Sequence, residues 1–166
     1  AIAETEALFG ESAPDDDGGP GEGGEPALEP DEGEEEDDEE EEDEERAMAI
    51  LEGERLLELG SIEREQSNYE DALKCYNKSL ALFQQLGHRK GEADAIGSLG
   101  VGYQNQGDSE RASEHFQIAI NIARDIGNKR SDGIHLGNLG NVYQSQGDYG
   151  QASEHLQLAI NIAREI

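Results

Sequence analysis

The sequence predicts an all-α fold, an α-solenoid of about three helix–turn–helix repeats preceded by a disordered acidic tail. Three observations predict it. A forty-residue unit occurs twice in tandem, at 87–126 and 127–166, with 21 of 40 positions identical, and a fixed period of this size is typical of stacked repeats. Apolar residues recur at helical spacing, and no segment shows the alternation of a strand. Acidic residues are concentrated at one end of the chain.

The acidic end spans residues 1–45. This segment holds 23 of the 40 acidic residues, all four prolines and no Lys or Arg, whereas the remainder carries 12 basic and 17 acidic residues. A segment of this composition buries too little apolar area to offset its chain entropy, so we expect disorder. We therefore expect a tail at 1–45 and a repeat domain at 46–166. The chain starts at Ala1 without Met, and we expect it to be a fragment of a longer protein.

The repeat domain should contain three repeats, at about 47–86, 87–126 and 127–166, the first of them degenerate. Gly107 and Gly147 are suited to the left-handed conformation that ends a helix, and the Asp after each is suited to cap the next one. Ser67-Asn68 should do the same less well. The expected helices span about 46–66, 69–86, 90–106, 109–126, 130–146 and 149–165.

The second helix of each repeat carries the expected core. In the last two repeats these residues are Ala112, Phe116, Ala119, Ile120 and Ala123, with Ala152, Leu156, Ala159, Ile160 and Ala163. We expect Gly100 and Gly140 to let helices approach where Ala112 and Ala152 cross. Leu156, Ile160, Ala163 and Ile166 should face the place of a fourth repeat or polar cap. We therefore expect self-association through this uncapped last helix, or packing against more chain.

Two motifs carry a family resemblance. In the second repeat these motifs are Leu99-Gly100-x-x-Tyr103 and Ala112-x-x-x-Phe116. In the third repeat the equivalent motifs are Leu139-Gly140-x-x-Tyr143 and Ala152-x-x-x-Leu156. The pattern resembles the tetratricopeptide repeat family. In length it is similar to the 40-residue variety of Pins/LGN-type spindle-orientation adaptors and of large bacterial signalling proteins. The resemblance implies that the first helices of the repeats line a concave groove, which binds a protein or peptide partner.

The resemblance also assigns groove positions. Asn141 falls on the Asn that Pins-type repeats use to hold a peptide backbone, and Val101 departs from that pattern. Because Gly97 and Gly137 carry no side chain, we expect them to let a peptide approach the groove floor closely. The groove residues implied by the family are Ser61, Arg64, Gly97, Ser98, Val101, Gln104, Asn105, Gly137, Asn138, Asn141, Gln144 and Ser145.

A basic edge recurs at the start of two first helices. It consists of Arg89, Lys90, Lys129 and Arg130, and we weigh a binding role equally with a role in solubility. His115 and His155 recur through duplication, and no further ligands point to a metal. Nothing supplies a base beside Cys75, which we interpret as a half-buried residue. We expect no cofactor and no catalytic residue.

The sequence thus predicts a non-enzymatic adaptor or sensor that binds a peptide or protein segment in the groove. One alternative is an acidic chaperone-like binder of a basic partner through residues 31–45, and another is the regulatory repeat arm of a larger signalling enzyme. We expect no nucleic-acid partner, because the acidic tail would repel phosphate. A single cysteine and the lack of an apolar run of about 20 residues lead us to expect no membrane partner and an intracellular, cytoplasmic location.

Overall fold

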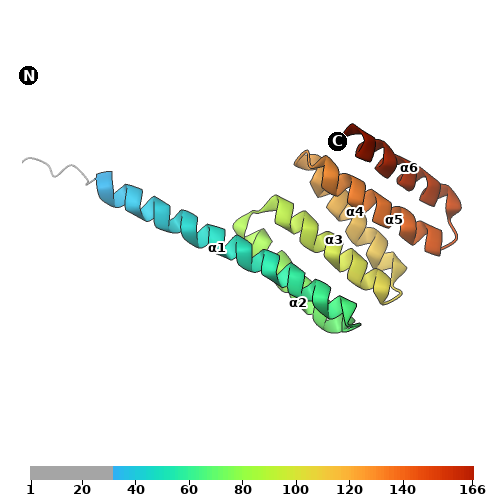
Figure 1. Ribbon diagram of the computed structural model, residues 1–166, viewed down its shortest axis with the longest axis horizontal. Helices are drawn as coiled ribbons and strands as arrows, with labels where there is room; N and C mark the ends of the chain where they lie inside the picture. Colours follow the sequence, from blue (N-terminus) through green and yellow to red (C-terminus); the bar gives the residue numbers. More distant parts are fainter. Residues whose placement is uncertain (1–31) are drawn as a thin grey trace, which may run out of the picture. The chain divides into compact units, whose positions relative to one another are not determined.

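The computed structural model describes residues 32–166, with side chains from residue 39 onward. The predicted disorder of residues 1–31 lies outside this described region. In the described part, the chain forms six helices and no strand, which confirms the all-α solenoid (Figure 1). The helices are α1 (Glu32–Glu65), α2 (Tyr69–Leu86), α3 (Arg89–Asn105), α4 (Ser109–Asp125), α5 (Lys129–Ser145) and α6 (Tyr149–Glu165).

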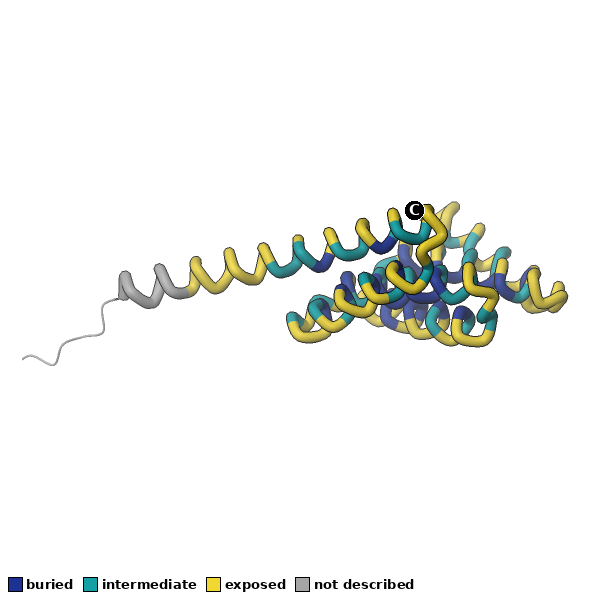
Figure 2. Tube along the Cα trace, turned by 90° about the horizontal axis from the view of Figure 1, so that it is seen from below, coloured by how far each residue is buried: buried dark blue, intermediate teal, exposed yellow. Residues whose placement is uncertain are grey.

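The start of α1 differs from the prediction. The helix begins at Glu32 rather than near residue 46, so residues 32–45 are helical where the sequence predicted disorder. Glu is a good helix former, and carboxylates near the N-terminus interact favourably with the helix dipole. These effects act locally and need no buried core, so a segment with little apolar area can still be helical. Every residue from Glu39 to Arg46 is exposed, and Figure 2 draws the described part of α1 next to the grey segment in the colour of exposed residues. The other helices begin and end within one residue of their predicted limits.

The turns within the repeats follow the predicted chemistry. Gly107 and Gly147 both have φ of 81°, and the side chains of Asp108 and Asp148 accept hydrogen bonds from the backbone N–H groups three residues later. In the first repeat Ser67 takes φ of 67° without the freedom of glycine. Asn68 makes no side-chain cap. The first turn therefore performs the same task with poorer residues, as predicted.

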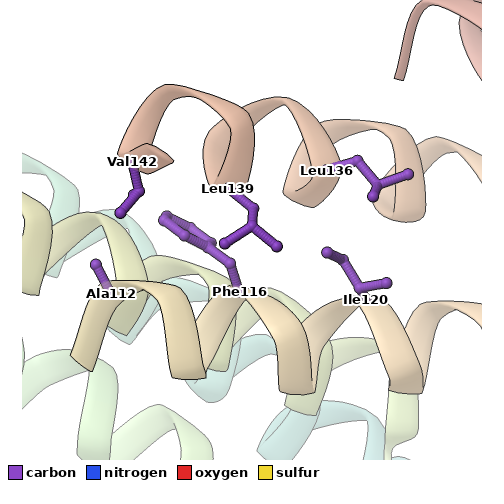
Figure 3. Close-up of a cluster of buried hydrophobic side chains, with 6 residues drawn as sticks. All are labelled: Ala112, Phe116, Ile120, Leu136, Leu139 and Val142. Carbon is purple, nitrogen blue, oxygen red and sulfur yellow. The ribbon is translucent and has the colours of Figure 1, made fainter. Parts of the chain in front are cut away.

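The largest buried cluster lies between α4 and α5. Figure 3 shows the Phe116 ring pointing from α4 toward Leu139 and Val142 of α5. All five predicted core residues of α4 are buried, which confirms that prediction. In α6 only Ala152 is buried, while Ile160 and Ala163 are exposed, because no helix covers that face in the described region. The helices α4 and α6 share the same apolar spacing, and these residues are buried only where a following helix covers them.

The close approach at Gly100 and Gly140 involves mainly a large side chain of the second helix of the repeat. A Cβ atom on Gly100 would lie 2.8 Å from the Phe116 ring, and one on Gly140 would lie 2.8 Å from the Leu156 side chain. Gly60 faces the Tyr76 ring in the same way. The glycine thus makes room for the large side chain of the second helix. The predicted approach at Ala152 is confirmed, because a Cβ atom on Gly140 would also lie 3.3 Å from the Ala152 carbonyl oxygen, whereas the three atoms nearest to such a Cβ on Gly100 all belong to Phe116.

Candidate partner-binding groove

A cavity of about 240 Å³ lies between α3 and α5. The two helices, which are the first helices of successive repeats, contact each other directly. Most of the lining side chains are polar or small. They are Asp94, Gly97, Ser98 and Val101 from α3, and Ser131, Ile134, His135 and Asn138 from α5. This face is the one on which the sequence placed the groove.

His135 and Gly97 meet in the lining of the cavity. A Cβ atom on Gly97 would clash with the His135 ring, and Gly97 itself is buried. The prediction that Gly97 clears the groove floor for a peptide was therefore wrong, because the imidazole of the next repeat already fills that space. His135 is only 6% exposed. Neither of its ring nitrogens has a hydrogen-bond partner among the described residues.

Burial sets the charge of His135. Loss of solvent lowers the pKa of the imidazole below its ordinary value, an effect larger than the opposing one from the carboxylates of Asp94 and Asp132. Each carboxylate has its own cation: Asp94 lies 3.3 Å from the Lys90 ammonium, and Asp132 lies 3.1 Å from the Arg124 guanidinium. The imidazole is therefore neutral near pH 7. A neutral imidazole offers one N–H donor and one nitrogen acceptor.

The structure gathers four of the predicted groove residues at this cavity, namely Gly97, Ser98, Val101 and Asn138. Ser98 and Asn138 are half-buried, so their polar groups can reach both protein and solvent. Val101 also packs against the buried cluster between α4 and α5. It therefore has a structural role in addition to lining the groove.

The remaining predicted residues are not part of the cavity, and several have partners of their own. The Ser61 hydroxyl donates to the Leu57 carbonyl, and the Ser145 hydroxyl donates to the Val142 carbonyl. The Arg64 guanidinium lies 3.9 Å from the Glu65 carboxylate. Gly137 has an open surround, since a Cβ atom there would meet only the Ala159 Cβ, at 4.0 Å. Gln104, Asn105, Asn141 and Gln144 lie outside the cavity lining.

Sequence reasoning missed Asp94, Ser131, Ile134 and His135 as lining residues. A signal for His135 was present in the repeat alignment. Position 97 is equivalent to position 57 of the first repeat, and position 135 is equivalent to position 95 of the second. The pair Leu57 and Ala95, large then small, is therefore replaced one repeat later by Gly97 and His135, small then large. A change from large–small to small–large indicates two positions that share one space.

The predicted basic edge is largely neutralised by neighbouring acids. The Arg89 guanidinium lies 2.6 Å from the Glu92 carboxylate, and Lys90 pairs with Asp94. The Lys129 ammonium lies 2.9 Å from the Glu165 carboxylate. Arg130 alone of the four forms no ion pair with another residue of the described region, and it lines a second cavity, beside α6.

The recurrent histidines have local partners. The Nδ1 atom of His115 lies 2.7 Å from the Arg111 carbonyl oxygen, and that of His155 lies 2.8 Å from the Gln151 carbonyl oxygen. Each ring packs against a tyrosine of the preceding helix. Among the side chains described from residue 39 onward, no group of three or more His, Cys, Asp or Glu residues is placed to hold a metal ion. None of the helices described here is long and apolar enough to cross a membrane.

Comparison with known proteins agrees with this geometry. A family model described as the tetratricopeptide repeat matches residues 54–125 and again residues 92–165. The chain belongs to the tetratricopeptide repeat family. Tetratricopeptide folds are generally non-catalytic scaffolds for protein–protein interaction. No curated protein matches the chain by sequence.

Solved tetratricopeptide and related structures share the fold at low identity. The chain is similar to BtubC from P. vanneervenii, at 24% identity and a TM-score of 0.63, over 68% of this chain and 47% of that one. It is similar to the TPR domain of Arabidopsis FLU, at 19% identity and a TM-score of 0.63, over 73% of this chain and 99% of that one. It is also similar to the apo form of RapI, at 19% identity and a TM-score of 0.64, over 70% of this chain and 33% of that one. The chain therefore spans about half the length of BtubC.

Proposed function

We propose that the chain is a non-enzymatic adaptor or sensor module whose α3–α5 face binds a peptide or a segment of a partner protein. The observation that carries the proposal is the cavity between α3 and α5, with the buried, unpartnered His135 imidazole among its lining residues. Buried polar atoms normally have hydrogen-bond partners, so an unpartnered imidazole in the lining of a cavity favours the binding of a polar group there.

The chemistry of the cavity suits a polar, extended segment. The Ser98 hydroxyl donates to the Asp94 carbonyl and keeps its oxygen lone pairs as acceptors. Asn138 and Asn141 are three residues apart on α5, so they lie on one face of the helix. Side-chain amides pair with backbone N–H and C=O groups whatever the peptide's own side chains. The segment would therefore be held mainly through its backbone.

Alanine substitution of these amides tests the proposal. The probe is a peptide selected from a random displayed library on the intact chain, with affinities measured by calorimetry. We expect Asn138→Ala or Asn141→Ala to weaken binding by about 1–2 kcal/mol, the loss for a hydrogen bond whose partner is left unsatisfied. The melting temperature of Asn141→Ala should stay nearly constant, because Asn141 is exposed.

Asn121→Ala is the matched control. Asn121 is an exposed residue of α4 that accepts a hydrogen bond from the Gln117 side chain, outside the α3–α5 face. This variant should bind like the original chain. Equal affinities for all variants, or equal losses in the control and groove variants, would refute a binding site on the α3–α5 face.

A second candidate rests on the exposed carboxylates of α1. Every residue from Glu39 to Glu45 is acidic and exposed on the helix, so residues 31–45 could bind a basic partner. Such binding should weaken as salt screens exposed charges, whereas the groove affinity should change little. In either case we infer no nucleic-acid partner and an intracellular, cytoplasmic location. We keep 1–45 and 46–166 as the proposed acidic segment and repeat domain, although α1 crosses that boundary.

A further inference from the structure

The contact between α4 and α5 has two apolar halves. Ala112, Phe116 and Ile120 of α4 meet Leu136, Leu139 and Val142 of α5, and all six are at most 2% exposed. The cluster joins one repeat to the next. The same arrangement returns one repeat earlier, where Ala72 and Tyr76 of α2 meet Leu99 of α3.

The first and the last helix of the described region carry the same halves, and no described helix covers them. Ala152, Leu156 and Ile160 of α6 occupy the repeat positions of the α4 half, and Leu56, Leu59 and Ile62 of α1 occupy those of the α5 half. Ile160 is 46% exposed, Leu59 is 39% and Ile62 is 45%. A cavity of about 420 Å³ lies beside the exposed face of α6. A repeat face that stays in contact with water is normally polar, and these two faces are apolar.

The charges at the two ends also match. Within the chain, the Arg124 guanidinium of α4 lies 3.1 Å from the Asp132 carboxylate of α5. The equivalent residues at the ends are Arg164 of α6 and Glu52 of α1. Arg164 forms no ion pair with another residue of the described region. The Glu52 carboxylate is bound by its exposed neighbour Arg55.

We propose that two copies of this chain stack head to tail, the α1 face of one copy docking on the α6 face of another as α5 docks on α4. The contact rebuilds the apolar cluster from Leu56, Leu59 and Ile62 of one copy and Ala152, Leu156 and Ile160 of the other. It places Glu52 where Asp132 lies in the repeat-to-repeat contact, opposite Arg164. Because the two surfaces differ, each copy keeps one free end, and further copies can add to the row.

The acidic residues oppose this stacking. Each copy has a net charge of −28, and neighbouring copies repel one another through it. Salt shortens the range of that repulsion, to about 10 Å at 0.1 M and about 3 Å at 1 M. The apolar contact is not weakened by salt. Self-association should therefore increase with salt, the opposite of the behaviour expected for an acidic segment that binds a basic partner.

Sedimentation of two variants tests the proposal. The original chain should form species of two or more copies at high concentration and 0.5 M salt. Leu59→Glu blocks the α1 face and Ile160→Glu blocks the α6 face, so each variant alone should sediment as a single copy. An equimolar mixture should form a dimer and nothing larger, because each variant supplies the intact face that the other lacks. Circular dichroism checks that both variants keep their helices.

Leu158→Glu is the matched control. Leu158 is an exposed leucine of the same helix, and its equivalent Ile118 stays 46% exposed although α5 covers the inner face of α4. This variant should associate like the original chain. A single copy under all conditions for the original chain overturns the proposal, as does a mixture that remains monomeric. Association of Leu59→Glu alone would show a symmetric α6 contact instead, and would overturn it too.

Discussion

The inner faces of α4 and α6 share a sequence pattern but differ in environment. Ile120 is 1% exposed and its equivalent Ile160 is 46% exposed; Ala123 is buried and its equivalent Ala163 is exposed. The helices are equally regular, and the two segments differ at only a few positions. The difference is the following helix: α5 covers this face of α4, and no helix of the described region covers the equivalent face of α6. Local sequence defines an apolar face, while the neighbour determines whether that face is core.

Substitution of the equivalent isoleucines should give the largest difference between these faces. Ile120→Ala removes a fully buried side chain, so it should lower the free energy of unfolding by about 2–5 kcal/mol. Ile160→Ala should change it by less than about 0.5 kcal/mol at low protein concentration, because the side chain is half-exposed. Urea unfolding of both variants measures the difference. Equal losses would mean that α6 is covered as well as α4 is.

Gly97 and Gly137 provide a second pair of equivalent positions. Gly97→Ala would force the new methyl group into the His135 ring, and overpacking costs about 1–3 kcal/mol of stability. Gly137→Ala meets only ordinary contact with Ala159, so it should raise stability by up to about 1 kcal/mol through helix propensity. Thermal melts of both variants test the opposite signs.

A double variant identifies the cause of the Gly97 effect. His135→Ala removes the ring that the methyl group meets, so adding Gly97→Ala to that variant should cost much less than adding it to the original chain. If the cost is unchanged in the double variant, the Gly97–His135 contact does not explain it. The contact between Gly97 and His135 would then not be what shapes the cavity.

The smallest expected effect is a pH dependence of stability. Burial lowers the pKa of His135 from its ordinary 6.5, so the unfolded chain binds a proton more readily than the folded chain. Stability should be highest above pH 6.5 and should fall as pH decreases through 6.5 toward the lower pKa of the folded state. The change in melting temperature between pH 7.5 and 5.5 should be smaller in His135→Ala. The same change in both proteins would exclude His135 as its source.

Much of the fold could be predicted from the sequence, because the residues that define turns and buried faces recur at equivalent positions of two repeats. The recurrence of Gly107-Asp108 as Gly147-Asp148 defined a turn and a cap, and the structure confirms both. The buried face of α4 followed from the helical spacing of Phe116 and Ile120. The start of α1 was missed because helix propensity in an exposed acidic segment needs no apolar pattern.

The groove was predictable only in part. Of the positions that the family resemblance assigned to the groove, Gly97, Ser98, Val101 and Asn138 line the cavity between α3 and α5, and their role in binding stays a prediction. His135 was missed because its importance depends on a partner in the preceding repeat, Gly97. Ser61 and Ser145 were assigned to the groove, but their hydroxyls bond to carbonyls of their own helices. A single helix does not reveal which side chains have such partners.

Amide hydrogen exchange of α4 and α6 at several protein concentrations tests the central claim most directly, because it reports how firmly each helix is held. If neighbours determine burial, the amides of α6 should exchange faster than those of α4 when the protein is dilute. Protection of α6 should then increase with concentration as a second copy covers it, while protection of α4 stays constant. Equal protection of the two helices in dilute protein would contradict the account.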